Sequence, residues 1–168
     1  MALKPFLVIL AAYALVLIGG GVTAYIIAPE GANKATALIV PAACSVLIAV
    51  AAVLSSMLKK CKPAGMVGIH VGLVLPLLFA AAFFHRGFAA NGAVEAYQEQ
   101  RTAYEAAGGE EGVGSFRDFL IAQGADEDLH DKSYLRNTLF TLGGASVVAF
   151  GLLLMQRPKA SERAATDG

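Results

Sequence analysis

Four long apolar runs, separated by polar breaks, dominate the pattern of the chain. None of the runs contains Asp, Glu, Lys or Arg, and they cover Phe6–Ala28, Thr36–Leu58, Ala64–Phe84 and Thr138–Met155. A helix crosses about 30 Å of hydrocarbon with roughly 20 residues, at about 1.5 Å each. Only a helix satisfies its own backbone hydrogen bonds in lipid when it is not part of a closed barrel. The pattern predicts an all-α membrane protein with a four-transmembrane-helix bundle.

The polar residues fall between these runs and define the expected organisation. Residues 1–87 hold the first three transmembrane helices, at about 6–28, 36–58 and 64–84. Residues 88–136 form a polar, acidic, partly helical segment outside the membrane, 137–157 the fourth helix, and 158–168 a disordered tail. The first run is much longer than the apolar region of a signal peptide, about 7–15 residues, so we interpret it as a helix that stays in the membrane.

The segment 88–136 predicts a small helical insertion between the third and fourth transmembrane helices. The Asn-Gly pair at 91–92 is typical of a chain break, and 93–107 has the amphipathic pattern of a helix. Ser115 is placed as the N-cap of a second short helix over 116–123. We expect these helices to form a cap on the mouth of the bundle or at the lipid interface. The alternative is a lid or a docking surface for a partner.

The basic residues predict the orientation of the chain. In a four-span topology one side receives Lys4, Lys59, Lys60, Lys62, Arg157, Lys159 and Arg163. The segment from 85 to 137, on the other side, holds ten acidic and five basic residues, a net charge of −5. By the positive-inside rule both termini are cytoplasmic, in the inner or plasma membrane if the protein is bacterial.

Small residues mark the faces on which the helices are expected to pack. Transmembrane helices gain little from burying apolar surface against each other, so they associate where small side chains allow close approach. The predicted packing positions are Gly19, Gly20, Ala24, Ser45, Ala49, Gly65, Gly68, Gly72, Ala145 and Ala149.

His70 is the one histidine inside an apolar run. It lies about 200° around the helix from Gly68, so it cannot share a contact made by the glycine face. It then faces lipid, another subunit or a cavity. Either it bonds a backbone carbonyl or a serine, or it binds a ligand, ligates haem or relays a proton. We carry His70 and Tyr13 forward as hypothetical ligand-binding residues.

The remaining polar residues show no catalytic or metal-binding spacing. The acidic run 126–131 lacks the glycine and the terminal glutamate of a calcium loop. Cys44, inside the second run, and Cys61, in the basic loop, cannot pair on this topology. The formal net charge of zero argues against a nucleic-acid partner. We therefore expect no enzyme activity, no cofactor and no metal.

The stretch from Tyr13 to Tyr25, YALVLIGGGVTAY, resembles the opening of the transmembrane-protein-14 family of small four-helix membrane proteins. Phe83-Phe84-His85-Arg86-Gly87 is similar to that family's aromatic and basic exit from its third helix. The resemblance implies a protein that moves lipophilic anions, such as fatty acids or porphyrin precursors. It matches Tyr13, Gly19, Gly20 and Tyr25 as packing positions. The second run lacks the glycines usual in the family, and the long polar segment before the last helix departs from it.

Two functions follow as expectations. The first is a multi-pass membrane protein that binds or transports a small lipophilic molecule, fatty acid or porphyrin-like. The alternative is an accessory or assembly subunit that docks to a membrane complex through its acidic segment 88–136. Membrane lipids, a lipophilic ligand, and a homo-oligomer or larger membrane complex are the expected partners.

Overall fold

The computed structural model describes residues 3–29, 34–126 and 129–156, and within them the chain is helical without any strand. The elements are α1 (Leu3–Ile27), α2 (Lys34–Ser56), the 3-10 turn η1 (Met57–Lys59), α3 (Lys62–Ala106), α4 (Gly109–Val113), α5 (Phe116–Ala122) and α6 (Ser133–Met155). The predicted tail 158–168 and two acids of the run 126–131 lie outside the described residues.

Four of these helices, α1, α2, α3 and α6, are long and apolar enough to cross a membrane. This confirms the predicted all-α fold with four membrane-spanning helices, and the chain is a multi-pass integral membrane protein. α6 begins at Ser133, earlier than the predicted 137 or 138.

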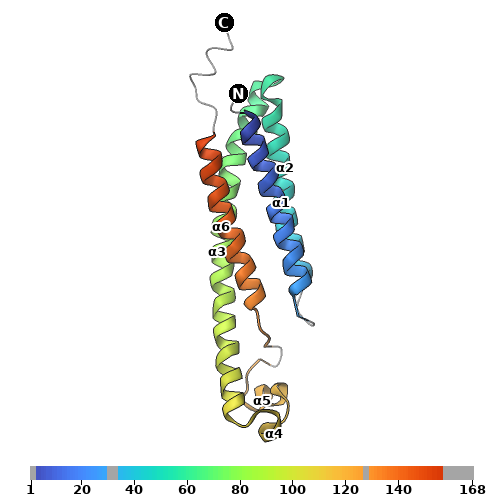
Figure 1. Cartoon of the computed structure of the whole chain (residues 1–168), viewed down its shortest axis with the longest axis vertical. Coiled ribbons are helices and arrows are strands. Elements are labelled where there is room, and N and C mark those ends of the chain that lie inside the picture. Colours follow the sequence, from blue (N-terminus) through green and yellow to red (C-terminus); the bar gives the residue numbers. More distant parts are fainter. Residues whose placement is uncertain (1–2, 30–33, 127–128, 157–168) are drawn as a thin grey trace.

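The four long helices pack side by side and antiparallel (Figure 1). α1 and α3 each contact both α2 and α6, and the closest pairings are α1 with α2 and α3 with α6. We call the end of the bundle at η1 and the start of α3 the lysine end, after Lys59, Lys60 and Lys62. The opposite end, towards α4 and α5, is the lobe end.

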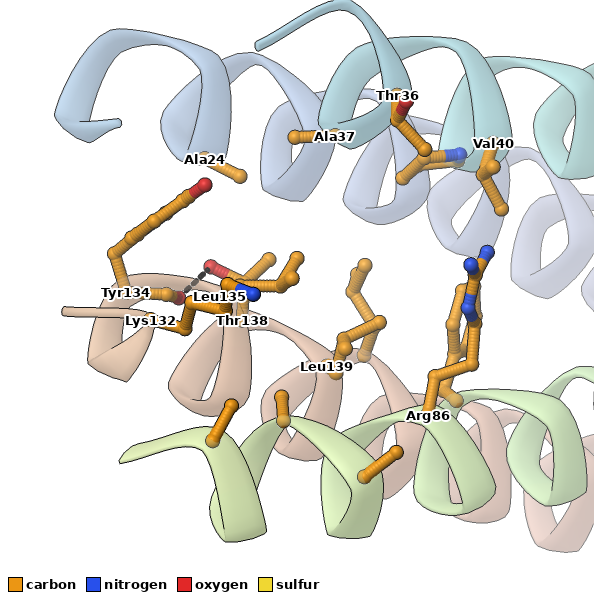
Figure 2. Close-up of a pocket in the computed structure, with 16 residues that line it drawn as sticks. Ala24, Thr36, Ala37, Val40, Arg86, Lys132, Tyr134, Leu135, Thr138 and Leu139 are labelled. Atoms are coloured by element: carbon orange, nitrogen blue, oxygen red, sulfur yellow. Dashed lines mark hydrogen bonds between the residues drawn. The ribbon is translucent and has the colours of Figure 1, made fainter. Parts of the chain in front are cut away.

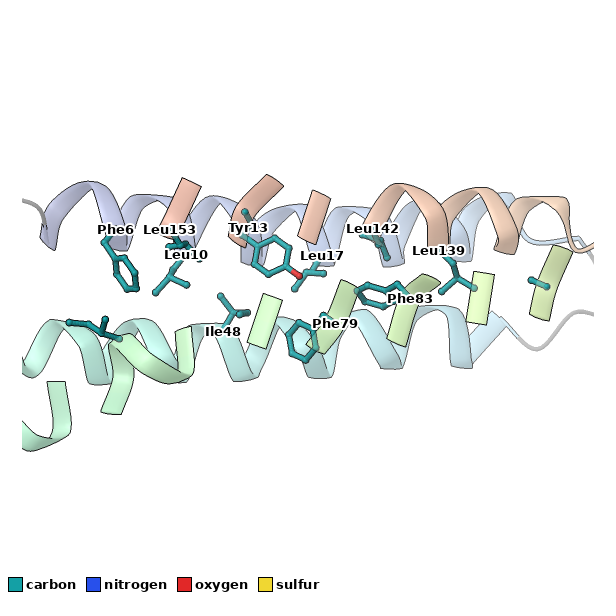
Figure 3. Packing of buried hydrophobic residues seen from close by; sticks show 13 residues of the cluster. Phe6, Leu10, Tyr13, Leu17, Ile48, Phe79, Phe83, Leu139, Leu142 and Leu153 are labelled. Atoms are coloured by element: carbon teal, nitrogen blue, oxygen red, sulfur yellow. The ribbon is translucent and has the colours of Figure 1, made fainter. Parts of the chain in front are cut away.

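Buried positions on α1, α2 and α6 recur at steps of three or four residues, as in left-handed helix bundles. The series runs through Phe6, Leu10, Tyr13, Leu17 and Ala24 on α1, and through Leu139, Leu142, Ser146, Ala149 and Leu153 on α6. Their large side chains form a continuous core along the bundle (Figure 3).

The same period corrects two predicted packing positions. Gly19 and Ala49 are exposed on the outer surface of the described chain. The prediction for α2 used the 100° per residue of a straight helix. A helix face chosen in this way drifts away from the 3.5-residue repeat of a supercoiled bundle over several turns. The buried residues of that half of α2 are Ile48, Ala51 and Ser55. Of the other predicted positions, Gly20 and Ala145 are half-buried, and Ala24, Ser45, Gly65, Gly68, Gly72 and Ala149 are buried.

Glycines bring α3 into backbone contact with its neighbours at the lysine end. A β-carbon at Gly65 would overlap the backbone of Leu58, and one at Gly68 would overlap the backbone of Ser55. One turn further, a β-carbon at Gly72 would lie 3.3 Å from Cδ1 of Leu10. The lysine end of the bundle is therefore closed by direct contact between helix backbones.

The predicted break at residues 91–92 is wrong, because α3 continues through it to Ala106. The Asn91 side chain donates to Oε1 of Glu95 at 2.7 Å and accepts from Nη1 of Arg136 at 3.2 Å, so it stabilises the helix and ties it to α6. A glycine inside a helix costs only about 1 kcal/mol, which these contacts offset. With 45 residues, α3 is about 68 Å long at about 1.5 Å per residue.

The lobe, defined as α4 and α5 with their connecting turns, packs on the end of α3 (Figure 1). Of the two predicted positions, the structure does not show the mouth of the bundle, and the lipid interface stays a prediction. The Tyr104 ring lies 5.2 Å from Phe116 and 5.6 Å from Phe119, between ring centroids. Ser115 caps α5 as predicted, because its hydroxyl accepts the Asp118 N–H at 3.2 Å. α4 was not predicted, since its sequence is rich in glycine.

Gly68→Ala is expected to lower the free energy of unfolding by about 1–3 kcal/mol, because the added methyl group overlaps the backbone of α2. Unfolding of the purified protein by SDS, followed by circular dichroism, measures it. Gly92→Ala is the matched control on the same helix, since no atom lies within 4 Å of the added carbon. It should leave stability unchanged or raise it by up to about 1 kcal/mol. Equal stability of the two variants would contradict the backbone contact.

Candidate functional site

A cavity of about 270 Å³ lies between the four long helices at the lobe end of the bundle (Figure 2). Every one of these helices contributes to its wall. The lining residues are Ala24 of α1; Thr36, Ala37, Val40 and Pro41 of α2; Phe83, Arg86, Ala89, Ala90 and Ala93 of α3; and, at the start of α6 and just before it, Lys132, Tyr134, Leu135, Thr138, Leu139 and Leu142.

The deep part of the cavity is apolar. Its floor is formed by Phe83 and Leu142, which are 2% and 1% exposed, together with the buried ring of Pro41. Alanines at positions 89, 90 and 93 of α3 leave the space open, since their side chains end at the β-carbon. The cavity therefore exists because α3 carries small side chains at these positions, and α1 and α2 do not fill the space opposite them.

The cavity carries two positive charges, which lie at its opposite ends. Arg86 rises from α3 towards α2 beside Val40, whereas the phenol of Tyr134 reaches from α6 towards Ala24 (Figure 2). Lys132, just before α6, lies on the Tyr134 side, and no acidic residue is among the lining residues. Within residues 3–29, 34–126 and 129–156, neither Arg86 nor Lys132 has an ion pair or a side-chain hydrogen bond.

Arg86 lies at the expected membrane boundary. The apolar stretch Ala64–Phe84 has 21 residues and is about 31 Å long as a helix, which matches about 30 Å of hydrocarbon. Arg86 follows two residues later, whereas Phe83 lies within the hydrocarbon. Contacts of Gly87 with Phe140 and of Gly143 with Phe84 put Arg86 level with Leu142, so the cavity extends from the membrane boundary towards the lobe.

Tyr13, one of the two predicted ligand contacts, is buried beneath the floor and does not line the cavity. Its hydroxyl lies 2.6 Å from Oγ of Ser146, which in turn lies 2.6 Å from the carbonyl oxygen of Leu142. A serine has one hydroxyl hydrogen, and the carbonyl can only accept, so Ser146 donates to Leu142 and Tyr13 donates to Ser146. The pair links α1 to α6 directly under the floor residue.

His70, the other predicted contact, is exposed on the outward face of α3, in the half of the helix nearest the lysine end. Its Nδ1 lies 2.7 Å from the carbonyl oxygen of Met66, one turn back on the same helix. This matches the expectation that it cannot share the glycine contact. The structure does not bring His70 and Tyr13 together, and neither reaches the cavity.

The cationic residues of the cavity were not among the predicted site residues. The signal was present in the charge pattern, because Arg86, Lys132 and Arg136 lie on the acidic side of the membrane, against the positive-inside trend. Arg86 also falls within the aromatic and basic stretch that resembles the transmembrane-protein-14 family. What was missing was the position of α6, which begins close enough to α3 for Lys132 and Arg86 to share one cavity.

Comparison with protein-family models, curated proteins and solved structures found no match for this chain. The resemblance of the first span to the transmembrane-protein-14 family therefore stays a prediction, and the function is argued from the cavity.

Tyr13→Phe is expected to lower the free energy of unfolding by about 0.6 kcal/mol and at most about 2, the range of single hydrogen bonds between membrane helices. SDS unfolding of the purified protein measures it. Tyr25→Phe is the control, since Tyr25 is on the same helix and 45% exposed. A double-mutant cycle with Ser146→Ala should show coupling between the two hydroxyls. Strictly additive effects would contradict the bond.

Proposed function

We propose that this multi-pass membrane protein binds a small lipophilic anion in the cavity at its lobe end and exchanges it with the membrane interface. The observation that carries the proposal is the pair of cations, Arg86 and Lys132, that line a largely apolar cavity and have no ion pair among the described residues. With the orientation expected from the lysines, this end of the bundle faces the extracytoplasmic side.

The charge arrangement selects the class of ligand. A cation that lies at the membrane interface without a protein partner attracts an anion, and a guanidinium forms two parallel hydrogen bonds with a carboxylate or phosphate. The hydroxyl of Tyr134, at the Lys132 end of the cavity, can donate a further hydrogen bond to an anion bound there. An uncharged lipid would leave the two cations unmatched, and a cation would be repelled by both. An amphipathic anion matches both the cations and the apolar wall.

The size of the cavity favours one of the two ligand types that the sequence suggests. Its volume is about 270 Å³. It lies below the usual range of about 300–1,000 Å³ for pockets of drug-sized ligands. A tetrapyrrole ring is far larger than this space, whereas a carboxylate with part of its acyl chain fits. We therefore favour a fatty acid over a porphyrin.

A second candidate function is the docking of a larger membrane complex through the lobe. The structure of the lobe favours this function. The lobe is folded around an aromatic cluster at Tyr104, on a helix that extends past the bundle. Arg101 lies over the rings of Tyr104 and Phe116, 5.4 Å from each centroid. Photo-crosslinkers at Glu99 and at Val53, which is exposed on α2, would separate the candidates in native membranes. A docking subunit yields one protein adduct from Glu99 alone, and an anion binder yields no discrete protein adduct.

Arg86→Gln is expected to weaken the binding of radiolabelled octanoate about tenfold or more, because a hydrogen bond to a charged group contributes about 1.5–3 kcal/mol. Scintillation proximity on immobilised protein in nanodiscs, with empty nanodiscs subtracted, measures the affinity. Lys132→Gln should weaken binding less, since an ammonium makes single hydrogen bonds.

Lys59→Gln is the matched control, because it removes one positive charge from the opposite end of the bundle and should leave the affinity unchanged. A second control replaces octanoate by octanol, which keeps the chain and removes the charge. Two results would refute an anion site at Arg86. One is that octanol displaces radiolabelled octanoate as well as unlabelled octanoate does. The other is that Arg86→Gln binds octanoate with the same affinity as Lys59→Gln.

A further inference from the structure

We infer that the preferred ligand carries an anionic group at each end of an apolar chain and bridges Arg86 and Lys132. The chemical class is a medium-chain α,ω-dicarboxylate. The inference rests on the proposed function, since it concerns the same cavity. It assigns Lys132 and Tyr134 as a second anion subsite, separate from the one at Arg86.

The register of α6 against α3 sets the distance between the two cations. Nη1 of Arg136 donates to Oδ1 of Asn91 at 3.2 Å, so these two positions lie side by side. The helices are antiparallel, so Lys132, one turn before this pair on α6, lies level with Glu95, one turn after it on α3. Glu95 and Arg86 are nine positions apart, which is about 13 to 14 Å along the helix at about 1.5 Å per residue.

The side chain of Arg86 does not close this distance. It rises across the cavity towards α2, beside Val40, and not along α3 towards Lys132 (Figure 2). A hydrogen bond between a charged donor and a carboxylate is only about 2.7–2.9 Å long. A ligand with one carboxylate therefore bonds one of the two cations and leaves the other without an anion.

Lys132 and Tyr134 provide the donors of the second subsite. The carbonyl oxygen of Lys132 accepts the backbone N–H of Arg136 at 3.0 Å, so the backbone of Lys132 is held at the start of α6. Its side chain is half-buried, and the phenol of Tyr134 lies at the same end of the cavity (Figure 2). An ammonium group and a phenol hydroxyl can both donate hydrogen bonds, so together they suit a carboxylate, which can only accept them.

Two acids lie near Lys132, Asp131 before it in the chain and Glu95 on α3, and neither lines the cavity. Oδ1 of Asp131 accepts the backbone N–H of Ser133 at 2.8 Å. Oε1 of Glu95 accepts from the side chain of Asn91 at 2.7 Å. Lys132 forms no ion pair with any residue that the structure describes, so its charge is available to a ligand.

The wall between the two cations is apolar and suits an alkyl chain. It is formed by Ala89, Ala90 and Ala93 of α3 and by Leu135 and Leu139 of α6. The hydroxyl of Thr138, which lies among them, donates to the carbonyl oxygen of Tyr134 at 2.8 Å, so its hydrogen is used within α6. An extended chain rises about 1.2 Å per bond, so the carboxyl carbons of decanedioate lie about 11 Å apart. With a hydrogen bond at each end, this length matches the separation of the cations.

Isothermal titration calorimetry tests the inference on the full chain in phosphatidylcholine nanodiscs, with empty nanodiscs subtracted. The titration is made at neutral pH, where carboxylates are ionised. Decanedioate is compared with its monomethyl ester, which keeps the length of the chain and removes one charge. Wild type should bind one decanedioate per chain, about tenfold or more tightly than the ester, because the dianion adds a second hydrogen bond between charged groups.

Lys132→Gln should abolish this preference, because it weakens the binding of decanedioate about tenfold or more and leaves that of the ester nearly unchanged. Lys132→Arg keeps the charge and should keep the preference. Arg86→Gln should weaken the binding of both ligands. Lys59→Gln is the matched control at the lysine end and should behave like wild type. Lys132 forms no side-chain hydrogen bond with the described residues, so its replacement should not prevent folding.

The outcomes separate this inference from the proposed function. A preference for the dianion that is lost in Lys132→Gln and kept in Lys132→Arg supports both. Equal affinity of wild type for the two ligands, or a preference that persists in Lys132→Gln, overturns the bridge and leaves an anion site at Arg86 intact. Two ester molecules bound per chain, without tighter binding of the dianion, also overturn the bridge, since the cations then hold separate anions. The absence of binding by either ligand refutes the proposed function itself.

Discussion

The structure depends on where the helix backbones touch. Inside a membrane, apolar side chains gain nothing by leaving lipid for protein. The close contacts of Gly65 with the backbone of η1 and of Gly68 with the backbone of α2 therefore provide packing that larger residues cannot. That contact closes the lysine end. At the lobe end α3 carries small side chains opposite larger ones on α6 and α2, without any comparable backbone contact. The space that remains there is the cavity.

The position of this cavity along the membrane normal determines which polar and apolar residues line it. Phe83 lies within the expected hydrocarbon, and the cavity reaches from there past Arg86 towards Lys132 at the lobe end. A deeper cavity would have no cations, because a charged residue at mid-membrane is costly. A shallower one would have no apolar interior. The same boundary explains why Tyr13 and Ser146 pair with each other: at their depth a hydroxyl needs a partner from the protein.

Much of the fold was predictable from the sequence, and most of the site was not. Apolar runs determine membrane helices strongly, so the four spans and the Ser115 cap were predicted from residues local in sequence. Burial at Gly65, Gly68 and Gly72 was also predicted, since a stripe of glycines indicates close packing. Ala49 failed because which face packs depends on the supercoil, and Gly19, which rested on the glycine cluster and the family resemblance, is exposed. Arg86 and Lys132 lie 46 positions apart, and only the pairing of α3 with α6 brings them to one cavity.

The most direct test of the account is the position of the bound anion. Solid-state NMR can measure dipolar coupling between the carbon-13 carboxyl of octanoate and nitrogen-15 arginine side chains in proteoliposomes. A hydrogen-bonded guanidinium and carboxylate place these nuclei about 4 Å apart. The account predicts coupling at that distance in wild type and its loss in Arg86→Gln. Bound octanoate without such coupling, or coupling that persists in Arg86→Gln, would contradict it.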